Sequence, residues 1–514
     1  MKKVHLSTFV LLGLCSILSA SAESRFVSLF NGENLDGWSC PEMGYWRVEN
    51  GAIVAQSTPE IPCSKNQFLV WQLGDIDNFH LKLKYKIEGS DNANSGIQFR
   101  SFVQPDGHAT GYQADMDRAM NWAGAIYDEH TGRKMLAKRG QKTVIDQAGK
   151  RTVTWLDKAD ALTKKINKDD WNEYEVIAID ESLTLKINGT VMCEVEDRET
   201  AHRDLIGKLA LQIHSGPPMK ISFKDIQLKR LPREDGRKKV VLVAGKPSHR
   251  AGDHEHNAGC LLLSKCLNES VSDRILPVVY HNGWPADPTA FDEVDAVIFY
   301  CDGWHRHMAL PHLESFDKVM AGGVGLGCVH FGVEVPPENG GSYFLRWIGG
   351  FYEAEYSVNP HWKANFTSLT KHPITRGINP YAIDDEWYFN MRFPKEMKGV
   401  IPILTAIPPK GLLPEKNHHH NSNAIARKMV AESSPQHMMW ATERPDGGRG
   451  FGFTGGHFHK NWGNENQRKI VLNAILWAAG AEVPETGVSS TVTEEDLAKN
   501  LDQKPVRKKK PKKN

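Results

Sequence analysis

Residues 248–259 read SHRAGDHEHNAG and place three histidines, an aspartate and a glutamate directly after the apolar run KKVVLVAG. Imidazole and carboxylate groups bind metal ions, and histidine also transfers protons near neutral pH. Either kind of chemistry needs groups that converge from several loops. The positions of the other histidines therefore decide whether this stretch is functional or only a polar surface.

Other histidines follow apolar runs in the same half of the chain: AVIFYCD precedes GWHRHM, GVGLGCV precedes HFG, and RGFGFTGG precedes HFHKNW. Continuous apolar runs that alternate with helical segments predict a parallel sheet covered by helices on both faces. Ligands bind such sheets beyond the carboxyl ends of the strands. We therefore predict that eight histidines gather at one rim, namely His249, His254, His256, His305, His307, His330, His457 and His459.

The chemistry of this rim has three interpretations. The first is a divalent metal site, for zinc or a similar ion, with the ligand candidates His249, His254, His256, His330, Glu386, His457 and His459, while His305 and His307 are candidates for substrate binding. Asp253 and Glu255 supply further carboxylates. The second is metal-free acid–base chemistry on a sugar. The third is a Cys328 nucleophile with His457 as its partner, although Cys328 lies within the strand and His330 takes the tip of the turn.

The first half of the chain has a different period. Runs such as FHLKLKYKI and YEVIAIDESLTLKING alternate apolar and polar residues, which predicts antiparallel strands with one solvated face. Residues 25–231 are predicted to form a β-sandwich of jelly-roll type, 232–237 a linker, 238–484 the α/β domain, and 485–514 a disordered basic tail. The His-rich segment 415–423 is predicted to be an exposed loop, with closure over the rim as the alternative.

The N-terminus and the composition indicate where the protein is located and which partners it has. Residues 1–22 combine Lys2 and Lys3 with a short apolar stretch and small residues, which predicts a signal peptide and export to the periplasm or beyond. A net charge of +1 gives no reason to expect nucleic acid as a partner, and no later segment predicts a membrane span. Cys40 and Cys63 are a candidate disulfide, and the oligomeric state stays open.

Several motifs of the second half occur together: KPSHRAGDHEHNAG, GCVHFGVEVP, DDEWYF and GGHFHKNWGNENQRKIVLNAILWAAG. In these motifs the segment 238–483 resembles the trehalose-utilisation (ThuA-like) family. The resemblance implies a flavodoxin-type fold like that of class I glutamine amidotransferases, in which the nucleophilic cysteine is replaced. It also implies a role in handling oxidised disaccharides.

The first half carries LFNGENLDGW, SGIQFRS, GYQADMD, GAIYDE and GKLALQIHSGPPMKISFKDIQLK. These motifs resemble the 3-keto-disaccharide hydrolase domain, a concanavalin-like sandwich. The resemblance implies an oxidised disaccharide or glycoside as substrate, and implies the catalytic candidates Arg100, Gln113, Asp115, Tyr127, Asp128 and His214. Many members carry a glutamate where this chain has Gln113. If that glutamate is their general base, either another residue such as Asp115 serves here or the activity differs.

Two further roles are predicted in the sandwich. Trp122 is a candidate platform for a sugar ring, and Asp115 with Asp117 could hold a calcium ion or form turns. We expect an enzyme that cleaves 3-keto-glycosides by elimination and hydration or by hydrolysis, with the ThuA-like domain acting on keto sugars. The alternative is a glycan-binding protein without catalysis, in which a lectin-like sandwich is attached to an inert scaffold.

Overall fold

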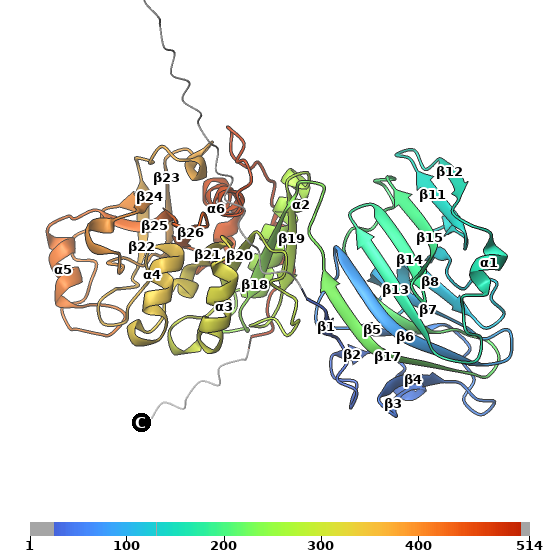
Figure 1. The fold of residues 1–514 in the computed structure, drawn as a ribbon. Coiled ribbons are helices and arrows are strands. Elements are labelled where there is room, and N and C mark those ends of the chain that lie inside the picture. The colour runs from blue at the N-terminus through green and yellow to red at the C-terminus, as the bar shows by residue number, and fades with distance from the viewer. Residues whose placement is uncertain (1–24, 130, 505–514) are drawn as a thin grey trace, which may run out of the picture.

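The computed structural model describes residues 25–129 and 131–504, which fold into a β-sandwich and an α/β domain side by side (Figure 1). The predicted signal peptide lies outside the described residues. No helix in the described part of the chain has the length and apolar character needed to cross a bilayer.

The sandwich consists of two sheets with one core between them. The larger sheet has the order β12 (Arg151–Trp155), β11 (Gln141–Ile145), β15 (Thr190–Asp197), β14 (Ser182–Ile187), β13 (Asn172–Ile179), β6 (Phe79–Gly89), β17 (Met219–Arg230), β4 (Ala52–Gln56) and β3 (Trp46–Glu49), with β1 (Val27–Ser28) beside β17. The second sheet has the order β10 (Lys134–Ala137), β9 (Ile126–Glu129), β8 (Ala109–Asp117), β7 (Asn94–Val103), β16 (Lys208–Ile213), β5 (Gln67–Trp71) and β2 (Trp38–Ser39). The short helix α1 spans Ala159–Thr163.

The predicted alternation is clearest in β6. Phe79, Leu81 and Leu83 are buried in the core, whereas the intervening His80 and Lys82 face outward. The strand pairs are antiparallel except for β11 with β15. The sequence prediction of a jelly-roll sandwich is therefore confirmed.

The α/β domain is built on one mixed sheet. Its order is β19 (Ile275–Tyr280), β18 (Lys238–Ala244), β20 (Ala296–Tyr300), β21 (Gly325–Val329), β26 (Arg449–Phe453), β25 (Gln436–Glu443) and β24 (Val400–Ala406). The first five strands are parallel, and β25 and β24 run antiparallel to their neighbours. A separate hairpin joins β22 (His361–Phe366) to β23 (Tyr381–Glu386).

Helices cover both faces of this sheet, as the continuous apolar strands predict. They are α2 (His256–Val271), α3 (Leu313–Met320), α4 (Ser342–Ile348), α5 (Ala424–Ala431), α6 (Glu465–Ala478) and α7 (Glu494–Ala498). Val240 and Leu242 of β18 pack in one core with α2 and α6, whereas Val241 and Val243 pack in the other with α3 and α4. The doubly covered α/β fold is confirmed.

Buried charges connect the two domains. The guanidinium of Arg230, at the end of β17, lies 2.8 Å from Oδ1 of Asp77 in the sandwich and 3.0 Å from Oδ2 of Asp287 in the α/β domain. Lys239 of β18 lies 3.4 Å from Oδ2 of Asp77. Although burial alone would raise it, Lys239 and Arg230 hold the pKa of Asp77 at about 2. The residues that flank the predicted linker are therefore fixed by ion pairs.

Two sequence predictions are wrong. Cys40 and Cys63 are both free thiols, so that the candidate disulfide does not form. Residues 485–504, predicted to be disordered, pack on the α/β domain and include α7, with a capping box between Thr493 and Asp496. The Lys504 ammonium donates to the backbone oxygens of Ser248, Asp253 and His254 at 2.6, 3.0 and 3.0 Å. We call residues 494–504 the C-terminal strap.

Candidate functional sites

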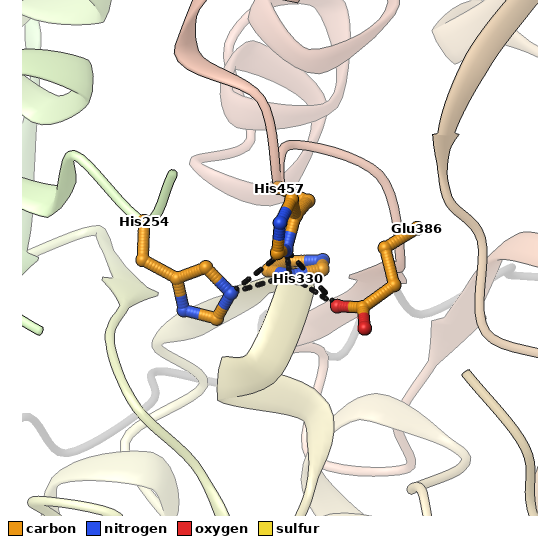
Figure 2. Close-up of side chains that lie close together, drawn as sticks. All are labelled: His254, His330, Glu386 and His457. Carbon is orange, nitrogen blue, oxygen red and sulfur yellow. Dashed lines mark hydrogen bonds and ion pairs between the residues drawn. The ribbon is translucent and has the colours of Figure 1, made fainter. Parts of the chain in front are cut away.

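Three strand ends and the hairpin bring four side chains together at the rim of the α/β sheet (Figure 2). His254 lies in the loop after β18, His330 directly follows β21, and His457 lies in the loop after β26. Glu386 is the last residue of β23. We call these four residues the histidine centre. Segments that are separated by up to 203 positions in the chain thus meet at one point.

The nitrogens and the carboxylate of the histidine centre lie at the mutual distances of metal ligands. Nε2 of His254 is 3.0 Å from Nδ1 of His457 and 3.1 Å from Nε2 of His330. Nδ1 of His457 is 3.3 Å from Nε2 of His330, and Oε2 of Glu386 is 3.0 and 3.4 Å from these two atoms. Ligands of a tetrahedral zinc ion with bonds of about 2.0–2.1 Å lie about 3.3 Å apart. The four groups therefore fit one divalent ion.

The outer nitrogens of two rings show which tautomer each ring adopts. Nδ1 of His330 lies 2.8 Å from the carbonyl oxygen of Thr454, which can only accept a hydrogen bond. Nε2 of His457 lies 3.4 Å from the carboxylate of Asp253. Both outer nitrogens therefore carry hydrogen, and the inner nitrogens present lone pairs to each other. Converging lone pairs beside a carboxylate favour a bound cation, and outer partners of this kind orient metal-binding histidines.

The loops of the histidine centre are held by their own backbone. The amide of His254 donates to the carbonyl oxygen of His457 at 3.0 Å. The buried carboxylate of Asp385 accepts from the amides of Gly456 and His457 at 2.9 and 3.1 Å. His254 and His330 have φ values of 48° and 53°, in the left-handed region. Non-glycine residues keep such strain where the surrounding structure fixes it, often at functional sites.

Electrostatics within the histidine centre reflect its mixed charges. Burial acts to raise the pKa of Glu386, but interactions with the adjacent imidazoles of His330 and His457 hold it well below its usual range. Burial alone would lower the pKa of His457, but the adjacent carboxylate of Glu386 outweighs burial, so that the pKa of His457 is raised. Burial and the neighbouring histidines lower the pKa of His254. A neutral His254 and an ionised Glu386 are the states in which these groups bind metal ions.

The remaining predicted rim residues lie outside the centre. His256 begins α2, and its Nδ1 lies 3.2 Å from the carbonyl oxygen of Lys246. His459 is buried beside Leu497 of α7, and burial lowers its pKa to about 4. His307 is buried and accepts the amide hydrogen of Ala309, while His305 lies on the surface against Trp304. His249 stacks on His254 with ring centroids 3.6 Å apart.

The Cys328 interpretation finds no geometric support. Cys328 is completely buried within β21, and burial raises the pKa of its thiol far above the usual range. The strained tip of the turn is occupied by His330 instead, which belongs to the histidine centre. Glu255 is also occupied elsewhere, because its carboxylate accepts the amides of Gly252 and Asp502 at 2.8 Å.

The His-rich loop 415–423 lies partly on the surface and partly against the rim. His418 and His419 are exposed, as the sequence predicts. His420 is partly buried, and its Nε2 lies 2.9 Å from Oε1 of Glu334. Burial raises the pKa of Glu334, and the charge of Glu386 adds to this.

A second candidate site lies on the outer face of the seven-stranded sheet of the sandwich. Tyr112 and Ala114 point into the core, so that Gln113 and Asp115 point away from it. Nε2 of Gln113 donates to Oδ1 of Asp115 at 2.5 Å. Oε1 of Gln113 accepts from the side-chain amides of Gln98 and Gln212 at 2.8 and 2.9 Å. The network fixes the orientation of the Gln113 amide, which therefore presents its donor to Asp115.

Asp115 is a buried carboxyl group, and no cationic side chain of residues 25–129 and 131–504 contributes to its pKa. Burial raises its pKa to about 8; the charges of Glu129 and Asp117 add to this, and the hydrogen bond from Gln113 opposes it. Tyr127 pairs directly with Gln113, and Glu129 lies two residues further on the same face. A protonated acid and a second carboxyl group on one face is the pattern of a general acid with a separate base.

The other predicted sandwich residues are placed differently. Arg100 is buried and donates to the carbonyl oxygens of Asp77 and Asp180 at 2.7 and 2.6 Å, so that it joins separate segments of the domain. Asp128 lies 2.5 Å from Nε of Arg133. Nδ1 of His214 lies 2.6 Å from the carbonyl oxygen of Ser215. Trp122 is 44% exposed.

Asp117 acts as a turn former. Its two carboxylate oxygens accept the backbone amides of residues 121, 122 and 123 at 2.7–2.8 Å. These hydrogen bonds occupy the oxygens that the calcium prediction requires. Asp115 is also a poor calcium ligand, because its raised pKa leaves it protonated at neutral pH.

Sequence reasoning did not single out Glu129 in the sandwich, or Asp302 and Tyr388 at the rim. Asp302 directly follows the strand run AVIFYC, and its position after a strand was an available signal. Tyr388 lies two residues after Glu386, and its hydroxyl is 3.2 Å from Nε2 of His330. Glu129 required the register of β8 with β9, which the sequence does not contain.

Comparison with solved structures finds chains that are similar to parts of this chain. A candidate glycosyl hydrolase from Parabacteroides distasonis ATCC 8503 is 22% identical, covers 40% of this chain and 94% of its own, and has a TM-score of 0.28. The carbohydrate binding module CBM66 from Bacillus subtilis is 12% identical over 38% of this chain and 95% of its own, with a TM-score of 0.27. A candidate ThuA-like protein from Bacteroides uniformis ATCC 8492 is 15% identical over 48% and 94%, with a TM-score of 0.36.

No curated protein matches the chain. Two family models match it, one for each domain, and the matches agree with the two resemblances seen in the motifs. Residues 25–229 match the 3-keto-alpha-glucoside-1,2-lyase-like domain, and residues 264–478 match the trehalose utilisation (ThuA) family.

Proposed function

We propose that the chain is an exported two-domain enzyme that cleaves 3-keto-glycosides in its sandwich and processes the released keto sugar at the histidine centre. The observation that carries the proposal is the buried acid Asp115, on one face with Glu129, within the residues that match the lyase-like domain. The predicted signal peptide supports export.

The proposed cleavage follows from the acidity of the substrate. A ketone at C3 acidifies the hydrogen at C2, and a base removes that hydrogen as a proton. The electron pair passes through the enolate and breaks the bond between C1 and the glycosidic oxygen, which takes a proton from an acid. The products are an unsaturated keto sugar and a free alcohol, and addition of water to the former gives the 3-keto monosaccharide. The step therefore needs one base and one acid.

We assign the acid to Asp115, because its pKa of about 8 leaves it protonated at neutral pH. We assign the base to the carboxylate of Glu129. Gln113 has no basic group; it positions Asp115 through its amide donor. This arrangement accounts for a glutamine at a position where many related domains carry a glutamate.

At the histidine centre we propose a divalent ion held by His254, His330, His457 and Glu386. Such an ion stabilises negative charge that develops on a carbonyl or enediolate oxygen. The Tyr388 hydroxyl lies 3.3 Å from Oε2 of Glu386. It can transfer a proton to the carbonyl or enediolate oxygen of a sugar bound there. His361 is half exposed, and its Nε2 lies 3.7 Å from Oε1 of Glu386 on the solvent side.

Turnover of the full chain tests the proposal. The purified protein is incubated with 3-keto-trehalose and, separately, with trehalose, and the released sugars are measured by chromatography. We expect release from the oxidised disaccharide alone. Equal cleavage of trehalose would contradict the proposal and favour ordinary glycoside hydrolysis. No release from either sugar would support a binding role.

Two variants and a chelator separate the domains. Asp115→Asn is expected to slow cleavage by about 100-fold or more, the usual contribution of a general acid. Asp225→Asn is the control, because it removes an exposed carboxylate of the same sandwich whose surface pair with Lys84 contributes little. A chelator is expected to leave cleavage unchanged and to stop any further conversion of the released keto sugar.

A further inference from the structure

A second group of ligand atoms lies on the other side of the His254 ring. Nδ1 of His254 is 3.5 Å from Oδ1 of Asp302, and Nδ1 of His249 is 3.7 Å from the same oxygen. All three atoms lie within 4.8 Å of one another. Neither nitrogen lies close enough to Asp302 for a good hydrogen bond. Nδ1 of His249 lies 3.0 Å from the Ser248 hydroxyl oxygen instead. Three groups thus surround one point without direct hydrogen bonds to each other.

Two buried nitrogens at this point have no hydrogen-bond partner in the described part of the chain. They are Nδ1 of His254 and Nε2 of His256, and both rings are almost completely buried. Nδ1 of His256 faces the carbonyl oxygen of Lys246 and therefore carries its hydrogen. Nε2 of His256 is then a bare lone pair, 4.0 Å from Oδ1 of Asp302. A lone pair that faces a carboxylate without a proton between them repels it, and a cation removes that repulsion.

Asp302 is held in place by polar contacts from its own surroundings. The Ser248 hydroxyl donates to its Oδ1 at 2.7 Å, and Nη2 of Arg306 lies 3.2 Å from its Oδ2. Ser248 and Asp302 also line a pocket of about 580 Å³ that includes Trp284 and His312. The group around Asp302 is therefore fixed and is open to a ligand from the pocket.

We propose that His249, His254 and Asp302 bind a second divalent transition-metal ion, so that the His254 imidazole bridges it to the ion of the histidine centre. The proposal rests on the proposed metal binding at that centre. His254 contributes Nε2 to the first ion and Nδ1 to the second, and the second binding event releases the remaining ring proton to solvent. His256 supplies a further nitrogen on the inner side. Imidazole-rich donor sets with one carboxylate suit zinc, copper or nickel.

The alternative is that Asp302 only orients His254, as a carboxylate that accepts the Nδ1 hydrogen. That arrangement leaves Nε2 of His256 without a partner in a buried position. In that arrangement Nδ1 of His249 donates to the Ser248 hydroxyl at 3.0 Å, and this hydroxyl donates to Asp302. The second ion gives a partner both to Nδ1 of His254 and to Nε2 of His256, the two buried nitrogens that lack one in the described part of the chain.

Metal content of the full-length protein tests the proposal. The protein is loaded with Zn²⁺, freed of excess ion by gel filtration and analysed by elemental mass spectrometry. We expect two ions per chain for the wild type. We expect one ion per chain for Asp302→Asn and for His249→Gln, which replaces a partly exposed side chain. Asp384→Asn, a carboxylate variant on the exposed side of β23, is the control and should keep two.

Copper provides a readout of the bridge itself. Two Cu²⁺ ions joined by one imidazolate couple magnetically, so that the electron paramagnetic resonance signal should rise up to one equivalent and fall with the second. In Asp302→Asn the signal should only rise and then level off. One ion per wild-type chain with no loss of signal would overturn the second site and leave the first intact. No bound ion at all would overturn both proposals.

Discussion

Asp115→Asn should stabilise the sandwich at neutral pH while it abolishes cleavage. In the folded chain the pKa of Asp115 is about 8, against 3.8 for the ordinary carboxyl group. At pH 7 the folded protein therefore keeps a proton that the unfolded chain loses. Each pH unit between the two values lowers the free energy of unfolding by about 1.4 kcal/mol, which amounts to about 4 kcal/mol at pH 7.

The sign of the pH dependence follows from the raised pKa. The contribution of Asp115 to stability is complete below pH 3.8, declines as the pH rises, and is lost once the pH passes about 8. Asparagine cannot ionise, and its side-chain oxygen can still accept the hydrogen bond from Gln113. The variant should therefore match the wild type near pH 4 and exceed it by about 4 kcal/mol at pH 7.

Hydrogen exchange followed by mass spectrometry measures this within the full chain. Amides of β7 and β8 report the free energy of opening of the sandwich, and amides of α6 in the other domain serve as an internal control. The Asn variant should slow exchange in β7 and β8 at pH 7 and leave α6 unchanged. If β7 and β8 exchange equally fast or faster in the variant at pH 7, Asp115 is ionised in the folded protein and cannot be the general acid.

Three further predictions concern the α/β domain and its attachment. Lys504→Ala should weaken metal binding by about tenfold in a chelator competition, because the loop of His254 loses its contacts with the strap; unchanged affinity would show that the strap does not order this loop. Arg230→Ala should lower the free energy of unfolding by about 3–5 kcal/mol in urea, since Asp77 and Asp287 lose their shared buried partner, and a loss below 1 kcal/mol would contradict this. Cys328→Ala should retain full turnover at a cost of about 1 kcal/mol in stability, whereas loss of turnover with intact folding would revive the nucleophile interpretation.

The sequence carries enough information for both folds because period and burial are local properties. The alternation in β6 and the continuous apolar run of β18 each identify a strand and its environment. The rule that ligands bind beyond parallel strands also predicts that His254, His330 and His457 converge. It cannot predict which histidines turn away, because that depends on the rotation of each loop. His307 and His459 thus satisfy the rule and still lie outside the centre.

Contacts across the chain account for the remaining errors. Glu129 gains its relevance from the register between β8 and β9, and Asp302 from the position of the His254 ring. The strap was predicted to be disordered because its composition is polar and charged. Its order arises from Asp502, whose backbone amide donates to the Glu255 carboxylate, and from Lys504, whose ammonium donates to backbone carbonyl oxygens of the loop after β18.

The strap also affects when the rim acquires its final shape. Lys504 contacts a backbone oxygen 250 positions earlier in the chain, and contacts between such distant segments form late because their loop-closure entropy must be offset first. We therefore expect the loop after β18 to become ordered late in folding. We expect a metal ion to bind after most of the domain has folded. The ion would then stabilise the folded domain without being needed to start folding.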